Sequence, residues 1–340
     1  MVICITEDRT KEEIAVKLLL LSLARHCPDT PIVLTYPPAS PQFARWVAAT
    51  IPGCTLRTAR VSGSSGWNIK ADALLGLLAE GHDEVWWLDS DIIVTGNFIE
   101  RYRDIPPATL VVCEEALYGA YRDDGARTRG WGFPVARSLP YSLNTGVMRV
   151  STLHLDLLKR WKVLLEDERY RAAQKDFWHR RPIHLMGDQD VLSALLGAEP
   201  FAETPMYVLQ RGRDILQYFG FSAYTTRERL ANLRHGPPAF IHCQGWKPWT
   251  SLAPERRASD IKTRLQNLYI ELSPYSFAAE SYRNQLDAPL PWLEHLSPMA
   301  RLFRLLGFHH AALTGLPIAM LIDLVRAVKG SGRRPAGERA

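Results

Sequence analysis

The first 110 residues alternate short apolar runs with stretches of helical periodicity, and this alternation restricts the possible folds more than any other feature. Residues 2–5 and 31–36 form two of the apolar runs. Between them, Thr10 to Glu13 has the spacing of a capping box, which predicts the start of an amphipathic helix. Strands that alternate with helices are typical of a parallel sheet. We therefore expect an α/β fold whose sheet is mainly parallel.

A further predicted helix, over residues 68–80 and ended by Gly81, precedes the most apolar strand of this region. That strand, residues 85–88, leads directly into Asp89, Ser90 and Asp91. Burying two ionised carboxylates inside a sheet would destabilise the fold by several kcal/mol. We therefore expect them at the carboxyl end of the strand, where α/β sheets bind ligands. There the two aspartates could share a divalent metal. The alternative is a surface turn with no ligand.

Three more polar clusters interrupt apolar segments. Asn144 and Gly146 lie in a predicted strand, where an amide offers a donor and an acceptor and a glycine permits close backbone approach. Asp188 opens a predicted helix, and His242 ends a short predicted strand. Each cluster also has a plain structural explanation: an edge-strand bulge, a helix-dipole partner and a buried structural histidine.

In this order, the four clusters resemble the nucleotide-sugar glycosyltransferases of the GT-A fold, most closely the retaining family 8, which includes glycogenin-like and lipopolysaccharide galactosyltransferase-like enzymes. The resemblance covers about residues 1–250. It rests on a DxD after an apolar strand, an Asn-x-Gly strand, an Asp-Gln helix start and a His-x-x-Gly loop followed by Lys-Pro-Trp. It implies a Rossmann-like, mixed, mainly parallel sheet flanked by helices, with a helical C-terminal extension.

This resemblance implies a role for each matched residue. Asp89, Asp91 and His242 would hold a metal ion against the donor's diphosphate, and carboxylates with one imidazole suit Mn²⁺ better than Mg²⁺. Asp188, Gln189 and Lys247 would be catalytic. The donor would be bound by a larger set: Thr6, Asp8, Lys70, Asp89, Asn144, Gly146, Asp188 and Lys247. In one departure from the family, only Trp246 separates Gly245 from Lys247, so Lys247 would reach the phosphates at a different angle.

The resemblance also implies a reaction with retention of configuration. The family places Gln189 nearest to the anomeric carbon, but an amide is a poor nucleophile. We therefore expect front-face attack, in which the leaving phosphate oxygen takes the acceptor's proton; Asp190 could instead supply a carboxylate. The implied donor is a nucleoside-diphosphate sugar, foremost a UDP-sugar carrying a hexose, and the implied acceptor is a saccharide, a lipid or a protein.

The chain's length and composition are those of a globular protein. With 340 residues, of which 46% are hydrophobic and 23% charged, it can form more than one domain. We expect a catalytic domain over 1–250, a wrapping helical segment over 251–300, an amphipathic segment over 301–329 and a disordered basic tail over 330–340. The stretch 115–142 has few helix or strand signals and could form an acceptor-binding lid.

The basic excess lies at the C-terminus. Of 41 basic and 36 acidic residues, residues 301–340 contain seven and two, so the first 300 residues are balanced at 34 each. A nucleic-acid-binding protein would spread its basic residues over a folded face, so we expect no nucleic-acid partner. We expect peripheral binding to an anionic membrane, because apolar and charged residues fall on different sides of a helix in 301–329: Leu313, Met320, Leu324 and Val328 on one, Asp323, Arg326 and Lys329 on the other. Packing against the catalytic domain is the alternative.

The chain has five cysteines without a CxxC pair and an N-terminus without a signal-peptide pattern, which favour the reducing cytoplasm. Together with the predicted membrane binding, this places the protein at the inner face of the membrane. Two other functions stay open. A strand that ends in DxD also opens haloacid-dehalogenase-type phosphatases, although Ile93 replaces the expected Thr or Val here. The third possibility is a non-catalytic, membrane-docked protein that binds nucleotide sugars.

Overall fold

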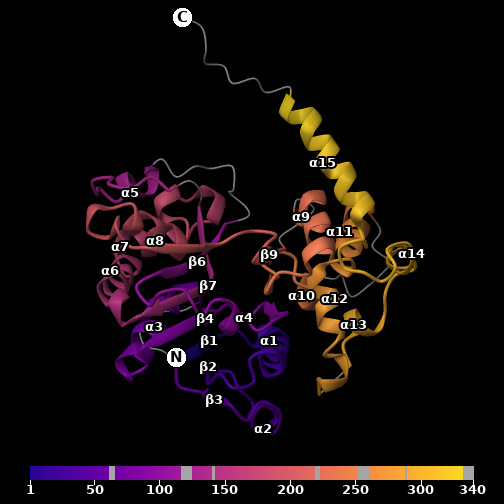
Figure 1. The fold of residues 1–340 in the computed structure, drawn as a ribbon, viewed down its shortest axis with the longest axis horizontal. Helices are drawn as coiled ribbons and strands as arrows, with labels where there is room; N and C mark the ends of the chain where they lie inside the picture. Colours follow the sequence, from indigo (N-terminus) through magenta and orange to yellow (C-terminus); the bar gives the residue numbers. More distant parts are fainter. Residues whose placement is uncertain are drawn as a thin grey trace, which may run out of the picture. The chain divides into compact units, whose positions relative to one another are not determined.

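The computed structural model describes residues 1–60, 66–115, 125–139, 142–218, 223–251, 260–287 and 289–331. Their contacts divide the chain into two compact units, Met1–Arg211 and Gly212–Ala340 (Figure 1). The boundaries predicted at residues 250, 300 and 329 divide the chain by the expected role of each segment, whereas the two units are defined by contacts. These boundaries stay predictions.

A mixed, mainly parallel sheet forms the centre of the first unit. Within the described residues its seven strands run in the order β3-β2-β1-β4-β7-β6-β8. They are β1 (Val2–Thr6), β2 (Ile32–Thr35), β3 (Cys54–Arg57), β4 (Glu84–Leu88), β6 (Leu110–Glu114), β7 (Leu143–Ser151) and β8 (Met206–Leu209). Only β7 runs antiparallel to its neighbours, β4 and β6. The predicted α/β class and mainly parallel sheet are thereby confirmed.

Helices cover this sheet. They are α1 (Glu13–His26), α2 (Pro41–Thr50), α3 (Lys70–Ala79), α4 (Phe98–Arg101), α5 (Ala126–Gly130), α6 (Leu155–Leu165), α7 (Glu168–Ala173) and α8 (Asp188–Leu196). Successive side chains of a strand point to opposite faces. Trp87 accordingly joins the core formed with α3, α6 and α8, whereas Trp86 packs edge-on against Phe98 of α4. A short strand, β5 (Ile92–Val94), packs on α1, and the Val94 N–H donates to Ser22 Oγ (3.0 Å).

The helix predicted after Thr10 begins differently from the expectation. Residues Thr10–Glu12 form a 3-10 turn, and in the described structure neither Arg9 nor Glu12 caps the following helix with its side chain. The N–H groups of Glu12 and Glu13 donate instead to the carbonyls of Arg9 and Thr10. The predicted capping box is therefore wrong: Thr10 lies inside the 3-10 turn rather than at an N-cap, and the Glu13 N–H that its side chain would accept donates to the Thr10 carbonyl.

Two other predicted segments differ in detail. The helix predicted over 68–80 starts at Lys70, because residues Gly66–Ile69 form a 3-10 turn; Gly81 follows it at φ 94°, as expected of a terminating glycine. The stretch 115–142 contains α5, and its residues 116–124 and 140–141 lie outside the described residues. The lid role of that stretch stays a prediction.

The second unit is mainly helical. Its strands β9 (Ile215–Gln217) and β10 (Phe240–His242) pair in parallel. Its helices are α9 (Thr226–His235), α10 (Pro248–Ser251), α11 (Ile261–Glu271), α12 (Pro274–Glu280), α13 (Pro291–Glu294), α14 (Pro298–Leu306) and α15 (Leu316–Ser331), which confirm the helical C-terminal part. Among the described residues, no helix combines the length and the apolar character that crossing a bilayer requires.

Candidate functional site

The carboxyl end of β4 meets the start of β7. Because the two strands are antiparallel, Leu88 lies opposite Val147, and the N–H of Asp89 donates to the carbonyl of Gly146 (2.8 Å). The Gly146 N–H in turn donates to Asn144 Oδ1 (2.8 Å). The sheet thus brings the Asn-x-Gly segment to the DxD segment, although more than fifty residues separate them.

Lys70, the first residue of α3, is a buried cation at this sheet edge, not an exposed helix-face residue. Its Nζ lies 3.1 Å from Asp89 Oδ1 and 3.4 Å from Asp188 Oδ2, and it donates to Thr145 Oγ1 (2.9 Å). Burial lowers the pKa of the Lys70 ammonium, but the carboxylates of Asp188 and Asp89 outweigh that effect and raise it above its ordinary value. Lys70 therefore joins a carboxylate of the DxD to the first carboxylate of α8.

Glu115, which was not among the predicted site residues, orients two of those that were. It is 1% exposed, and its Oε2 accepts from Asn144 Nδ2 (3.0 Å) and from Gln189 Nε2 (2.8 Å). Asn144 Nδ2 also donates to Gln189 Oε1 (3.1 Å). The signal was present in the sequence: Glu115 follows an apolar strand, β6, almost as Asp89 follows β4.

The start of α8 holds two buried carboxylates with different partners. Asp188 Oδ2 accepts from Thr145 Oγ1 (2.8 Å), and burial raises the pKa of Asp188 despite the opposing effect of Lys70. Asp190 Oδ1 lies 2.7 Å from Arg127 Nε of α5. Burial raises the pKa of Asp190 to about 6, again against the nearby cation. Asp188 therefore belongs to the cluster around Lys70, whereas Asp190 forms an ion pair that joins α8 to α5.

The end of β1 lies beside the DxD segment, because β1 and β4 are parallel neighbours. Glu7 connects them: its Oε2 accepts from Ser90 Oγ (2.6 Å), and its Oε1 accepts from Arg9 Nε (2.7 Å). Of the predicted donor-binding residues here, Thr6 is buried at the strand end and Asp8 is half-buried. Glu7, which lies between them, makes the contact to the DxD segment.

In the second unit, His242 is the last residue of β10 and is buried. Its carbonyl accepts from the N–H of Tyr218 (2.7 Å), and the carbonyl of Tyr218 accepts from the N–H of Gly245 (3.0 Å). Lys247 is half-buried directly before α10, with its Nζ 5.6 Å from the ring centroid of Trp249. The strand end and the following loop are thus held by backbone hydrogen bonds.

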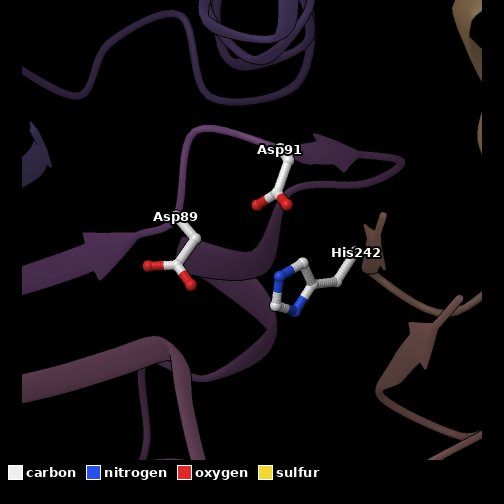
Figure 2. A group of neighbouring side chains, drawn as sticks. All are labelled: Asp89, Asp91 and His242. Carbon is white, nitrogen blue, oxygen red and sulfur yellow. The ribbon is translucent and has the colours of Figure 1, made fainter. Parts of the chain in front are cut away.

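The three predicted metal ligands are neighbours. In Figure 2 the carboxylates of Asp89 and Asp91 and the imidazole of His242 point toward one another. One ligand atom from each lies within 4.8 Å of the other two. Ligand atoms on one divalent ion, each at roughly 2.0–2.6 Å, lie at most about 4–5 Å apart. Two carboxylate oxygens and an imidazole nitrogen therefore fit a divalent-metal site.

No protein-family model matches the chain, and no curated protein matches it. Among solved structures, the chain is similar to the apo WbbM bifunctional glycosyltransferase, at 11% identity and a TM-score of 0.49; the match covers 73% of this chain and 46% of WbbM. It is also similar to the galactosyltransferase LgtC in complex with donor and acceptor sugar analogues, at 16% identity and a TM-score of 0.45, over 84% of this chain and 100% of LgtC.

A third similar structure is mouse xyloside xylosyltransferase 1 in its apo form, at 17% identity and a TM-score of 0.45, over 71% of this chain and 96% of that one. All three are glycosyltransferases, the class that the ordered motifs predict. Since their TM-scores lie below 0.5, the function proposed below rests on the side chains of this chain rather than on these similarities.

Proposed function

We propose that this protein is a metal-dependent glycosyltransferase of the GT-A fold that acts on a nucleoside-diphosphate sugar with retention of configuration. The observation that carries the proposal is the double contact of Lys70, 3.1 Å from Asp89 and 3.4 Å from Asp188. Lys70 thereby links Asp89, a carboxylate suited to a metal ion, with the cluster around Asp188. That cluster consists of carboxylates and amides, which are suited to sugar hydroxyls. A nucleotide sugar needs both, since its diphosphate is bonded directly to its sugar.

Asp89, Asp91 and His242 would hold the ion, Mn²⁺ or Mg²⁺, which when bound supplies a Lewis acid for the charge on the leaving diphosphate. The carboxylate of Asp89 is prepared for this role, because Trp87 Nε1 donates to its Oδ1 (2.8 Å). Lys70 and Lys247 would add positive charge beside the phosphates. Asn144, Gly146, Thr6 and Asp8 would complete the donor site.

Around the sugar, Asp188 would accept hydrogen bonds from ring hydroxyls, while Gln189 would lie beside the anomeric carbon. The Gln189 amide donates to Glu115, which directs its nitrogen and leaves the carbonyl oxygen beside Asn144. An amide in this arrangement positions rather than attacks. The leaving phosphate oxygen would then take the acceptor's proton in a front-face displacement, while the lysines offset the developing negative charge.

The donor sugar, the acceptor and the location of the reaction are proposed from the motif resemblance. The donor would be a UDP-sugar carrying a hexose, and the acceptor a saccharide, a lipid-linked saccharide or a protein. The reaction would take place in the cytoplasm, at the inner face of the membrane.

A haloacid-dehalogenase-type phosphatase would use Asp89 as its nucleophile. The Asp89 carboxylate accepts from Trp87 Nε1 and lies 3.1 Å from Lys70 Nζ. Its remaining lone pairs could serve a metal ion or an attack on phosphorus, so the two functions are separated by their products. Release of phosphate from a phosphomonoester, without release of a nucleoside diphosphate from a sugar donor, would favour the phosphatase.

The decisive variant is Asp91→Asn, which keeps the shape of the side chain and removes a metal ligand. We expect Mn²⁺-dependent release of nucleoside diphosphate from sugar donors to fall at least about 100-fold, because even indirect metal contacts contribute 10–100-fold. Mn²⁺ binding, followed by electron paramagnetic resonance, should weaken in parallel, with an unchanged circular dichroism spectrum.

The matched control is Asp104→Asn, at a carboxylate that is 95% exposed. We expect this control to keep parental turnover, which EDTA abolishes. Undiminished metal-dependent turnover of Asp91→Asn would disprove the metal assignment.

A further inference from the structure

Large apolar side chains are concentrated on the surface of the C-terminal helices. Ten of the twenty exposed large apolar residues in the described part of the chain lie between residues 299 and 328. They are Met299, Leu302, Leu305, Leu306, Phe308, Met320, Leu321, Leu324, Val325 and Val328. Soluble monomers seldom expose large contiguous apolar patches, and such patches mark interaction sites.

On α15, these residues form one side of the helix. Met320, Leu321, Leu324, Val325 and Val328 follow an i, i+1, i+4, i+5, i+8 pattern, which places them on a single face. The prediction had also put Leu313 on this face, and that is wrong: α15 begins at Leu316, so Leu313 lies in the preceding turn and is half-buried. The side chain of Lys329 lies outside the described residues.

Contacts on the opposite side hold α15 in this orientation. Asp323 Oδ2 accepts from the N–H of Thr226 at the start of α9 (2.8 Å). Ile318 and Ile322 line a small cavity together with Arg229 of α9. The guanidinium of Arg229 also donates to the carbonyl of Thr314, just before the helix (2.6 Å). In Figure 1 the first turns of α15 lie near α9, and its later turns extend away from the other helices of this unit.

Helix α14 shows the same division. Met299, Leu302, Leu305 and Leu306, at i, i+3, i+6 and i+7, are exposed, whereas Ala300 and Arg304 are buried. Arg304 pairs with Glu280, and its Nη2 donates to the carbonyl of Glu271 (2.9 Å). Both helices are therefore anchored on one side and expose an apolar face on the other. We call these two faces, with Phe308 between them in sequence, the apolar docking faces.

The net charge of residues 301–340 indicates which kind of partner covers these faces. Residues 301–340 contain seven Arg or Lys and only two acidic residues. Arg304 is buried against Glu280, which leaves six basic residues, and one of the two acids, Asp323, accepts from Thr226 at the start of α9. An anionic bilayer attracts basic groups and accepts apolar side chains into its interface. A second copy of this chain would instead bring two basic segments together. We propose that the apolar docking faces bind an anionic lipid bilayer, a role that does not depend on the proposed sugar transfer.

The test is flotation of the full-length protein with phosphatidylcholine vesicles, with and without phosphatidylglycerol. We expect binding to the anionic vesicles, weakened by added NaCl because salt screens the basic residues. In the full chain, L321Q/L324Q and L305Q/L306Q should each reduce partitioning at least about tenfold, because each removes two apolar side chains from the buried area. Since these side chains are exposed, the melting temperature should not change.

The matched control is L153Q/V163Q, which replaces two exposed apolar residues of the first unit (70% and 52% exposed). It should partition like the parent. Equal partitioning of all variants, or equal binding to neutral and anionic vesicles, would overturn the proposal. So would a concentration-dependent dimer in analytical ultracentrifugation that the L321Q/L324Q variant abolishes, because the faces would then cover each other. No sugar donor is present, so failure here leaves the proposed transferase function untouched.

Discussion

At the scale of single residues, Lys70 is the group on which the site most depends. It is 3% exposed and is the cation shared by Asp89 and Asp188. A buried carboxylate that loses its partner costs several kcal/mol, much more than an exposed pair is worth. One ammonium thus lies between two carboxylates of the site.

We predict that Lys70→Met lowers the free energy of unfolding of the metal-free protein by about 3–5 kcal/mol, because it leaves the buried carboxylate of Asp188 and the half-buried one of Asp89 without their cation. Mn²⁺ should restore part of this loss by replacing the missing positive charge. Urea unfolding with and without Mn²⁺ measures both effects. Lys159→Met, at a 64% exposed lysine, is the control. A Lys70 variant as stable as this control would contradict the prediction.

At the scale of helices and strands, the 3-10 turn Thr152–His154, which leads into α6, depends on a histidine that must stay neutral. The N–H of Ser151 donates to His154 Nδ1 (3.0 Å), which closes a capping box. A protonated imidazole has no lone pair to accept this bond. Burial lowers the pKa of His154 below its ordinary value of 6.5. The cap therefore requires a pH at which the ring is unprotonated.

The sign of the resulting pH dependence follows from proton binding. Below about pH 6.5 the unfolded chain takes up a proton at this position, while the folded chain takes it up only at lower pH. We predict that acidification through this window lowers the free energy of unfolding, by at most about 1.4 kcal/mol per pH unit for this group. His154→Gln should remove that part of the slope in denaturant titrations, whereas His179→Gln, at an exposed position, should retain it. An unchanged slope in the first variant would refute the assignment.

At the scale of the whole molecule, the proposed donor and metal should bind together. A ligand that binds only the folded state adds about 2.7 kcal/mol of stability at 100 times its dissociation constant. We predict that UDP with Mn²⁺ raises the melting temperature more than the sum of the separate effects of UDP and Mn²⁺, since the ion bridges protein and diphosphate. A thermal-shift screen of nucleoside diphosphates, with Mn²⁺ or with EDTA, reports both the base and the metal dependence. An identical shift in EDTA would exclude a metal-bridged donor.

Some features followed directly from the sequence because they are local. The apolar run of β4, its abrupt end at Asp89, and the polar start of α8 at Asp188 are set by residues adjacent in the chain. Local periodicity therefore predicted the fold class and the two aspartates at a strand end, whereas the roles of Asp188 and His242 came from the motif resemblance. Local periodicity failed at Thr10, where backbone hydrogen bonds replaced the expected side-chain cap. It also missed the capping box at Ser151, because the partner there is a histidine rather than the usual Glu or Gln.

The tertiary structure alone decided which of these groups meet. Only the antiparallel pairing of β7 with β4 brings Asn144 to the DxD segment, and only the adjacent end of β6 brings Glu115 to Gln189. The burial of Lys70 and the outward apolar side of α15 likewise depend on which elements pack beside them. Periodicity along a chain records which side of an element is apolar, but strand order and packing partners arise from contacts between distant residues.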